Sequence, residues 1–566
     1  MNHAAKRINP HQQFGAVVLD SNQTQFRVWA PEHDNVVLDL VDQNRQVVMT
    51  KDQAGFHSVV ETCPSGTRYL YRVDQGPPRP DPASRFQGDG VHGPSQVVDP
   101  TFQWTDQDWR GVDRSDLIIY ELHIGTLTDE GTFVSAIDRL DELVELGITA
   151  IELMPVATSA GRWNWGYDGV NLFAPLSAYG TPDDLRRLVN AAHEKGLAVI
   201  LDVVYNHLGP EGNYLSEFGP YLSSRHNTVW GAAPNFDDPD HGPTVRQFII
   251  AAATIWLDEY HIDGLRVDAI HCMRDDSPTH IAVDISRAVQ NWSAVTGRRA
   301  TLIAESNVYD PNMLDPIQDG GVGFDAQWCD DFLHSVFAVV RPGEQLCHRQ
   351  YQPSDLKQTL EKGYIFKGTL QQPDQRCQPT DRVDTRGLIY SIQHHDFIGN
   401  HPLGKRLHQL TSRQTQKAAA ALLLLSPAIP MLFMGEEFCC EQPFSFFVDF
   451  GDEHLRDAVI KGRKQEYPQH DWSAGVLPTD PEAFQQSKIG PVSAGDTAMR
   501  DWYIYLIGLR KAWKQSGLLC DENLTVNTDL ETGTFELHYK NERDSADVIV
   551  KLSQNHDKSS VTIQTR

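Results

Sequence analysis

Four short polar clusters in the middle of the chain each follow a run of apolar or β-branched residues. They are Asp202-Val203-Val204-Tyr205-Asn206-His207, Gly264-Leu265-Arg266-Val267-Asp268, Ile303-Ala304-Glu305 and His394-His395-Asp396. A single cluster of this kind is ordinary, because a strand meets water where it ends and aspartate favours the turn that follows. Four in succession are harder to explain by turn chemistry, so we expect them to build one functional site.

Two of the carboxyl groups have the spacing that cleavage of a glycosidic bond requires. Asp268 and Glu305 lie 37 residues apart (305 − 268), about one strand-helix unit, which would place them on neighbouring parallel strands. Glycoside hydrolysis uses one carboxylate that attacks the anomeric carbon and one protonated carboxyl that donates to the leaving oxygen. A separation of about 5–5.5 Å between the two groups is typical of the retaining mechanism.

Side chains near this pair could keep it charged and bind a sugar. Arg266 lies two residues before Asp268, so both side chains point to the same face of a strand. A guanidinium there would keep Asp268 ionised, and the alternative is a buried structural ion pair. Asp396 could bind sugar hydroxyls and stabilise an oxocarbenium-like transition state. His207 and His395 are candidate hydroxyl donors, although isolated histidines are more often ordinary core residues.

Aromatic residues lie close to these clusters in the sequence. Trp163, Trp165, Tyr167 and Phe397 could form platforms for pyranose rings, whose apolar C–H faces pack against aromatic rings. The alternative for each of them is packing within a loop. We favour the platform most strongly for Tyr167.

The elements that would position these residues alternate between strands and amphipathic helices, which is typical of a parallel sheet. Thr181, Pro182 and Asp184 predict a capped helix start. Another helical face is predicted from the spacing of Phe133, Ile137, Leu140 and Val144. Strands are predicted over residues 117–120, 149–153, 197–204, 262–267, 301–304, 324–328, 388–393 and 430–434. Eight such units predict an α/β fold of the (β/α)8 TIM barrel type, with the polar clusters at the active-site end.

The two ends of the chain have a different pattern. Short alternating runs separated by turn residues recur over residues 14–72 and again over 524–565, which indicates antiparallel sheets. We therefore expect an N-terminal β-sandwich over residues 1–104, a catalytic barrel over 105–515 and a small C-terminal β-domain over 516–566.

Composition excludes several classes of partner. The formal net charge of −27 would repel both nucleic acid and anionic membrane surfaces. Residues 1–10 contain no signal-peptide core and no run of about 18 apolar residues occurs, so we expect a cytoplasmic protein. The cysteines lack CxxC spacing, and neither a phosphate-binding glycine loop nor an EF-hand is present in the sequence. We expect no cofactor and no metal ion, and the sequence carries no signal of the oligomeric state.

The four clusters, in this order, resemble the four short motifs of the α-amylase clan of glycoside hydrolases. Within that clan the chain is most similar to the malto-oligosyltrehalose trehalohydrolases. The similarity extends over residues 81–86, 90–95, 120–126, 165–169, 330–332 and 399–400. Segments 81–86 and 120–126 also occur in branching enzymes, and it is Asp275-Asp276-Ser277-Pro278-Thr279-His280 and Pro443-Phe444-Ser445-Phe446-Phe447 that favour the trehalohydrolases.

The resemblance implies an N-terminal sandwich of the carbohydrate-binding type and a role for each motif residue. By motif position Asp268 would be the nucleophile, Glu305 the general acid/base and Asp396 the transition-state stabiliser. The substrate-binding residues would be Tyr167, which stacks on the sugar, with Asp202, His207, Arg266, His395, Trp165 and Asp275. The reaction implied is hydrolysis of the α-1,4 bond that joins trehalose to a maltooligosaccharide, which releases trehalose.

Two positions depart from the family pattern, and two alternatives remain. His394 stands where the clan motif usually has asparagine, and His401 stands where the family usually has arginine. A branching enzyme or a general α-amylase would share the catalytic residues. A catalytically inactive glucan-binding protein is the alternative from another class, and retention of all three carboxylates argues against it.

Overall fold

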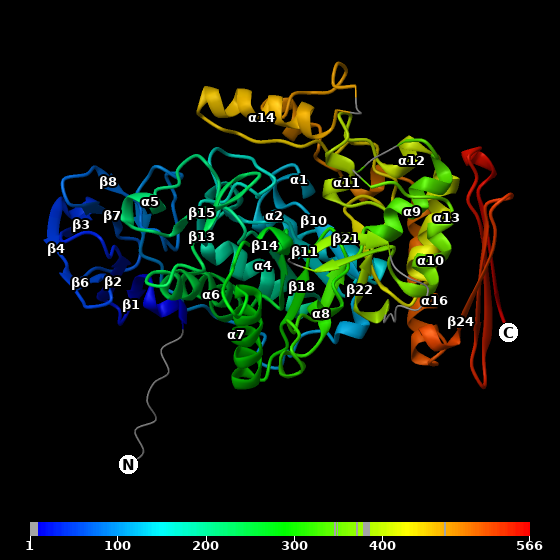
Figure 1. Cartoon of the computed structure of the whole chain (residues 1–566), viewed down its shortest axis with the longest axis horizontal. Coiled ribbons are helices and arrows are strands. Elements are labelled where there is room, and N and C mark those ends of the chain that lie inside the picture. The colour runs from blue at the N-terminus through cyan, green and yellow to red at the C-terminus, as the bar shows by residue number, and fades with distance from the viewer. Residues whose placement is uncertain (1–9, 345–346, 348, 370–371, 377–384, 469–470) are drawn as a thin grey trace, which may run out of the picture.

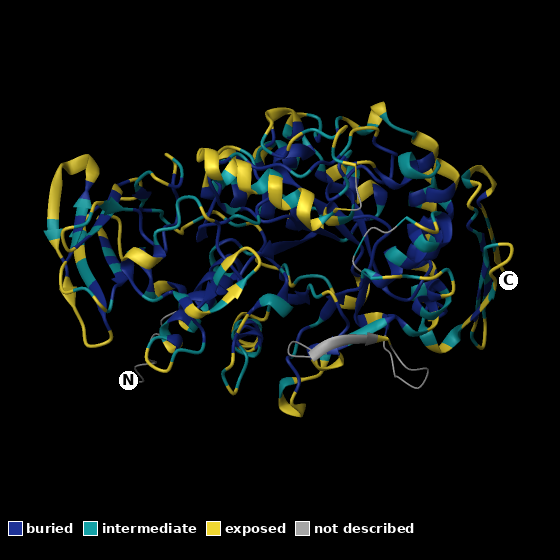
Figure 2. Ribbon diagram, turned by 45° about the horizontal axis from the view of Figure 1, so that its top comes forward, coloured by how far each residue is buried: buried dark blue, intermediate teal, exposed yellow. Residues whose placement is uncertain are grey.

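A computed structural model describes residues 10–344, 347, 349–369, 372–376, 385–468 and 471–566. Residues 1–9 lie outside the described residues. The prediction that the chain has no signal-peptide core depends in part on them. In Figure 1 the N-terminal sheets lie at one end of the molecule, the barrel in the middle and the C-terminal sheet at the other end. Figure 2 shows buried residues throughout the centre and exposed residues on peripheral helices and hairpin tips.

A closed barrel of eight parallel strands forms the centre of the described chain, which confirms the predicted (β/α)8 fold. Each strand pairs with the next in chain order, and the last pairs with the first. The strands are β10 (Ile119–Leu122), β11 (Ala150–Leu153), β14 (Ala198–Val203), β17 (Gly264–Val267), β18 (Thr301–Ala304), β19 (Ala326–Trp328), β22 (Leu388–Tyr390) and β23 (Ile429–Phe433). They are buried along their whole length, because helices cover the outside and apolar side chains such as Ile119, Ile200 and Ile303 fill part of the inside.

The register of the central strands brings the polar clusters to one level. Asp202 of β14 lies opposite Arg266 of β17. Val267 at the end of β17 lies opposite Ala304 at the end of β18. The residues that follow these two strand ends are therefore neighbours across the rim of the barrel.

The helices are mostly amphipathic and cover the barrel. Among the longer ones, α4 (Pro182–Glu194) begins with the predicted capping box between Thr181 and Asp184. The predicted helix over 133–144 is two helices, α2 (Phe133–Ile137) and α3 (Leu140–Leu146), and Val144 is exposed. The other helices are α1 (Ile124–Leu127), α5 (Leu215–Phe218), α6 (Gly242–Glu259), α7 (Ile281–Thr296), α8 (Pro311–Leu314), α9 (Asp331–Val340), α10 (Asp355–Lys362), α11 (His395–Gly399), α12 (Leu407–Leu410), α13 (Arg413–Leu424), α14 (Glu453–Glu466), α15 (Pro481–Gln485) and α16 (Thr497–Gln515).

Two antiparallel sheets form the N-terminal part, as the alternating runs predict. Phe26, Tyr69 and Tyr71 are buried in these sheets, and Trp29 is buried against Tyr221. One sheet contains β1 (Gly15–Val18), β2 (Gln23–Trp29), β6 (Phe56–Thr62) and β5 (Thr50–Lys51). The other contains β4 (Arg45–Val48), β3 (Val36–Leu40), β7 (Arg68–Val73), β8 (Pro78–Arg79) and β9 (Ser95–Gln96).

The C-terminal part is a four-stranded antiparallel sheet that contacts α13. Its strands are β24 (Leu524–Asp529), β25 (Thr534–Lys540), β26 (Ser545–Lys551) and β27 (Ser560–Thr565). Among the described residues, further two-stranded antiparallel sheets pair β12 (Ala157–Thr158) with β13 (Asn171–Pro175), β15 (Leu222–Thr228) with β16 (Gly231–Pro234), and β20 (Phe366–Thr369) with β21 (Gln372–Arg376). The predicted domain boundaries stay predictions. Among the described residues, none of the helices has the length and apolar character needed to cross a membrane.

Candidate active site

The three predicted catalytic carboxylates lie at the carboxyl end of the barrel. Asp268 and Glu305 directly follow adjacent strands, and their backbone N–H groups extend the sheet by donating to the carbonyls of Val203 and Val267, at 3.0 Å in each case. Asp396 lies in the first turn of α11, which begins shortly after β22. All four polar clusters thus reach the end of the barrel at which the resemblance places a catalytic site.

Asp268 is held by two donors. Arg266 Nη1 lies 2.8 Å from its Oδ1, and Asn206 Nδ2 donates to Oδ2 at 2.9 Å. The same guanidinium nitrogen pairs with Asp202 at 2.9 Å, and the guanidinium carbon lies 4.2 Å from the ring centroid of Trp328. The two donors fix the orientation of the carboxylate, as a nucleophile requires.

Glu305 has the opposite environment. Burial raises the pKa of its carboxyl to about 8; Asp268 and Asp330 add to this effect, while Arg266 opposes it. The backbone N–H of Ala269 donates to Oε2, which fixes the side chain beside Asp268. A carboxyl group with this pKa holds its proton at neutral pH, the state that a general acid needs.

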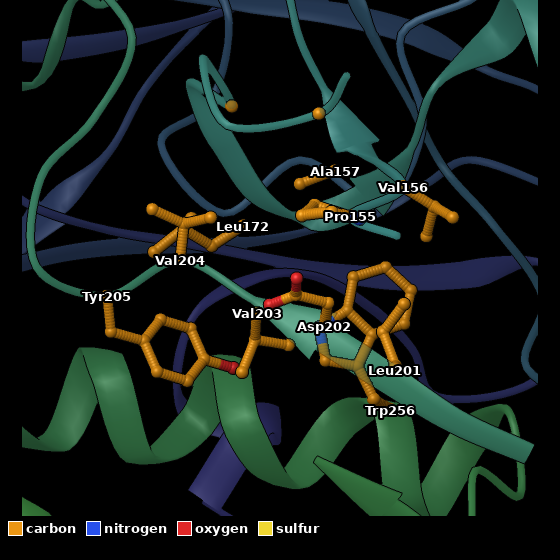
Figure 3. A pocket seen from close by; sticks show the side chains of 12 residues that line it. Pro155, Val156, Ala157, Leu172, Leu201, Asp202, Val203, Val204, Tyr205 and Trp256 are labelled. Atoms are coloured by element: carbon orange, nitrogen blue, oxygen red, sulfur yellow. The ribbon is translucent and has the colours of Figure 1, made fainter. Parts of the chain in front are cut away.

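Asp202 lies on the side of Arg266 that faces Tyr167. Its Oδ2 accepts a hydrogen bond of 2.6 Å from the Tyr167 hydroxyl. Burial raises the pKa of Asp202 to about 6, against the opposing charge of Arg266. Figure 3 shows a small pocket that Asp202 lines together with apolar residues such as Pro155 and Val203.

A hydrogen-bonded chain runs from Tyr167 through His395 to Glu121. The Tyr167 hydroxyl lies 2.9 Å from His395 Nε2, and the two rings are stacked with centroids 5.2 Å apart. The other ring nitrogen of His395 contacts the Glu121 carboxylate. Burial alone would raise the pKa of Glu121, but the neighbouring histidine rings lower it below its usual value. Glu121 therefore fixes the orientation of His395.

Asp396 is exposed, and its support comes from a distant part of the chain. Its Oδ1 accepts a hydrogen bond of 2.8 Å from Asn400, which directly follows α11. Asn400 also donates to the hydroxyl of Tyr467, at 2.7 Å, and accepts from Arg463. Arg463 lies in α14 and Tyr467 follows it, so this peripheral helix reaches the catalytic end of the barrel.

His207 lies on the opposite side of the cluster. One of its ring nitrogens is 3.0 Å from the carbonyl oxygen of Tyr167. The indole of Trp230 is stacked on the imidazole, with ring centroids 4.9 Å apart and planes inclined by 28°. Trp230 is 48% exposed and lies in the turn between β15 and β16, so one face of a large aromatic ring is offered to solvent beside the site.

Comparison with known sequences identifies the family. Residues 13–84 match the carbohydrate-binding module 48 (isoamylase N-terminal domain), and residues 96–230 match the alpha amylase catalytic domain. The malto-oligosyltrehalose trehalohydrolase of Saccharolobus solfataricus is 40% identical over 528 residues, which cover 92% of this chain and 90% of that protein. The chain belongs to the malto-oligosyltrehalose trehalohydrolase family. The family member of Arthrobacter ramosus is 39% identical over 86% of this chain and 87% of its own length.

Solved structures share the fold of this chain. A Salmonella typhimurium protein provisionally called an alpha amylase superposes with a TM-score of 0.87 at 35% identity, covering 95% of this chain and 93% of its own. A pullulanase from Anoxybacillus sp. LM18-11, solved with maltotetraose, superposes with a TM-score of 0.70 at 20% identity and covers 98% of this chain and 85% of its own. At that identity the likeness to the pullulanase concerns the fold alone.

Trp165 and Asp275, which were predicted to bind substrate, are both buried. Trp165 is buried at 3% exposure, and its indole N–H donates to the carbonyl of Ser445 at 2.9 Å. Its ring edge packs on His395, so it supports that residue from behind. The side chain of Asp275 has no exposed surface and forms an ion pair of 2.6 Å with Arg246. The predicted contacts of these two residues with substrate stay predictions.

Several residues at the site were not singled out as site residues from the sequence. Glu121 lies in a segment that carried the family resemblance, but nothing in the sequence signalled its contact with His395. Asn206 lies inside the cluster of residues 202–207, in which only Asp202 and His207 were predicted to bind substrate. Trp230 and Tyr467 lie in turns far from any motif, and only the fold brings them to the site.

A potential metal-binding group in the described part of this chain consists of His226, Asp237 and Asp276. The Nε2 atom of His226 lies 2.8 Å from Asp237 and 3.3 Å from Asp276. The guanidinium of Arg225 lies 3.5 Å from Asp237 and 3.2 Å from Asp276, so these carboxylates already have a cationic partner. The four residues form an ion-pair network that joins the β15–β16 hairpin to the loop after β17.

Proposed function

We propose that this chain is a retaining glycoside hydrolase that cleaves the α-1,4 bond between trehalose and the maltooligosaccharide of maltooligosyltrehalose, releasing trehalose. The observation that carries the proposal is the pairing of Asp268, held by Arg266, with Glu305, whose pKa is raised to about 8, on adjacent strand ends. Relatives that are about 40% identical to this chain over most of its length are named malto-oligosyltrehalose trehalohydrolases, and their name supports the choice of substrate.

In the first step Glu305 donates its proton to the oxygen of the scissile bond while an Asp268 oxygen attacks the anomeric carbon. The carbon–oxygen bond to trehalose breaks, trehalose leaves with the proton on its own hydroxyl, and the sugar remains as an ester on Asp268. Glu305 is then an anion. In this state it attracts Arg266, whose Nη2 lies 3.8 Å from Oε2.

In the second step a water molecule enters where trehalose left. The Glu305 carboxylate takes a proton from this water, and the resulting oxygen attacks the anomeric carbon and displaces Asp268. Two displacements restore the original configuration, so the maltooligosaccharide first appears as the α-anomer. Glu305 regains the proton that the next turnover needs.

The remaining residues bind and orient the sugar. We assign Asp396 to hydroxyl binding and to stabilising the positive charge that develops on the sugar ring, because it is an exposed carboxylate oriented by Asn400. Tyr167, whose ring stacks on His395, would pack against the sugar at the cleavage point. Both ring nitrogens of His395 and of His207 already contact protein atoms, so these two residues would line the sugar site and hold Tyr167 in place. Trp230 would support the glucan chain.

We assign the leaving disaccharide to a cavity whose lining contacts Phe397, the residue after Asp396. It has a volume of about 280 Å³ and is lined by residues of α9 and of the segment after it, including His334, Phe337 and Tyr351. The ring of Phe337 contacts that of Phe397, which directly follows Asp396. Such a cavity gives the bent trehalose unit a shaped site of its own.

The experiment compares two substrates of equal length, maltotriosyltrehalose and maltopentaose. We expect kcat/KM to be roughly 100-fold or more higher for the first, since hydrogen bonds left unpaired by the wrong sugar supply about 3 kcal/mol. Free trehalose and α-maltotriose should be the first products seen by NMR. Equal values for the two substrates would indicate a general α-amylase, glucan transfer would indicate a branching enzyme, and binding without turnover would indicate an inactive glucan-binding protein.

A further inference from the structure

An ion pair that the proposed mechanism does not use lies after β19, the strand next to β18 in the barrel. Gln327 of β19 pairs with Ala304, the residue before Glu305, and Asp330 follows three residues later. Asp330 follows β19, and its Oδ1 lies 3.3 Å from Nε2 of His394, the residue that precedes α11. The Asp330 side chain is 41% exposed, while that of His394 is only 4% exposed. The carboxylate thus faces outward with a buried imidazole behind it.

The surroundings of His394 are predominantly acidic. Burial by itself would lower the pKa of this histidine, but Asp330, with smaller contributions from Glu121 and Asp396, raises it to about 9. The ring also packs against Trp328, at 5.1 Å between centroids, and lies 5.8 Å from the ring of His395.

Other groups act on the same pair from neighbouring elements. Burial by itself would raise the pKa of Asp330, but His394 and the Arg266 guanidinium of β17 lower it. His334 of α9 also lies close to Asp330, but burial lowers the pKa of its ring to about 4, so this ring is neutral at neutral pH. Asp330 is therefore an anion at every pH at which the protein would work. Its negative charge in turn raises the pKa of the Glu305 carboxyl, after the effects of burial and of Asp268.

We propose that His394 is a positioning residue whose imidazolium holds the Asp330 carboxylate and offsets its charge beside Glu305, so that the pair sets the alkaline limit of catalysis. The inference rests on the proposed role of Glu305 as the proton donor. It assigns a function to the histidine at the position where the clan motif usually has asparagine.

A purely structural role for His394 makes a different prediction. The backbone N–H of Phe397 lies 3.4 Å from His394 Nδ1, so a neutral imidazole could cap α11. This distance is at the long end for a hydrogen bond, and a protonated ring cannot accept it. Asparagine is one of the best helix caps, so His394→Asn preserves the cap and removes only the charge.

The first measurement is the pH dependence of kcat/KM for trehalose release, which reports groups of the free enzyme. In His394→Asn the charge of Asp330 is no longer offset, so the alkaline limb should move to higher pH by about 0.5 to 1 unit. In the double variant that adds Asp330→Asn, both charges are gone and the limb should return close to that of the wild type. An unmoved limb in His394→Asn, or a double variant that stays shifted, would overturn the proposal.

The second measurement does not depend on activity. In protein labelled with 15N-histidine, signals absent from His394→Asn belong to His394, and they should report a charged ring at pH 7 in the wild type. In Asp330→Asn the midpoint of this titration should fall by more than one pH unit. A neutral His394 ring at pH 7 in the wild type would overturn the proposal and leave the capping role.

The variant Glu305→Gln separates this inference from the proposed function. With an activated aryl maltooligoside, which needs little acid assistance, Glu305→Gln should lose the alkaline limb altogether. If the limb persists there, the assignment of Glu305 fails. If the limb disappears in Glu305→Gln and stays unmoved in His394→Asn, only the role of His394 fails.

Discussion

The raised pKa of Glu305 predicts the pH range of the reaction. With a pKa of about 8, about nine-tenths of the molecules carry the proton at pH 7, whereas at the usual value of about 4.3 roughly 0.2% would do so. The environment of Glu305 therefore increases the population of the acid form by a factor of several hundred, which corresponds to about 4 kcal/mol. Most of this effect comes from burial, with the charge of Asp268 and Asp330 added to it.

The assay measures kcat/KM for trehalose release from maltotriosyltrehalose between pH 5 and pH 10. We expect a plateau through neutral pH and a limb that falls tenfold per unit above about pH 8. Glu305→Gln should lower the rate with this substrate much more than with an activated aryl maltooligoside, because only the first needs a protonated leaving group. An alkaline limb that begins below pH 6, or equal losses with the two substrates, would refute the reasoning.

Three further predictions test other parts of the molecule. Asp268→Asn should lower turnover by roughly four powers of ten or more with an unchanged melting temperature, because an amide cannot form the glycosyl ester; a folded variant with a near-normal rate would contradict the assignment. Trp230→Ala should raise KM for long substrates roughly fivefold through loss of about 1 kcal/mol of ring contact, while Trp230→Phe should keep most of it; an unchanged KM in the alanine variant would exclude the platform. Burial raises the pKa of Glu436 to about 8, so its contribution to stability is present at acidic pH and is lost as the pH rises from the usual glutamate value towards 8. The melting temperature of Glu436→Gln should therefore fall less between pH 5 and pH 8 than that of the wild type. An equal fall in the two proteins would argue against a protonated Glu436.

The architecture could be predicted from the sequence because the same strand and helix signals recur along the chain. Each barrel strand is a short apolar run between turn signals, and eight of them in alternation with helices leave few other folds. The spacing of Asp268 and Glu305 predicted their neighbouring positions for the same reason. The bounds of a single helix are predicted less well. Val144 fits the helical period, but the helix is interrupted at residues 138–139 and the Val144 side chain is exposed.

The details of the site depend on contacts between distant segments. Trp165 and Tyr167 are neighbours in sequence and equally aromatic, yet the first is buried against Phe444 and the second faces Asp202. Asp275 forms an ion pair with Arg246, which lies 29 residues away in the sequence. Local pattern carries no information on which of two similar side chains faces the opening, because that is decided by the packing of the loops.

The link between α14 and Asp396 makes the catalytic centre dependent on a helix at the surface of the molecule. This helix lies outside the barrel in Figure 1, and none of its residues is buried. Segments with few buried apolar contacts open locally at a lower free energy than the core. When α14 detaches, Asn400 loses both Arg463 and Tyr467, and Asp396 loses a fixed orientation while the barrel remains folded. Heat inactivation would then precede global unfolding, and the working temperature would follow the attachment of one surface helix.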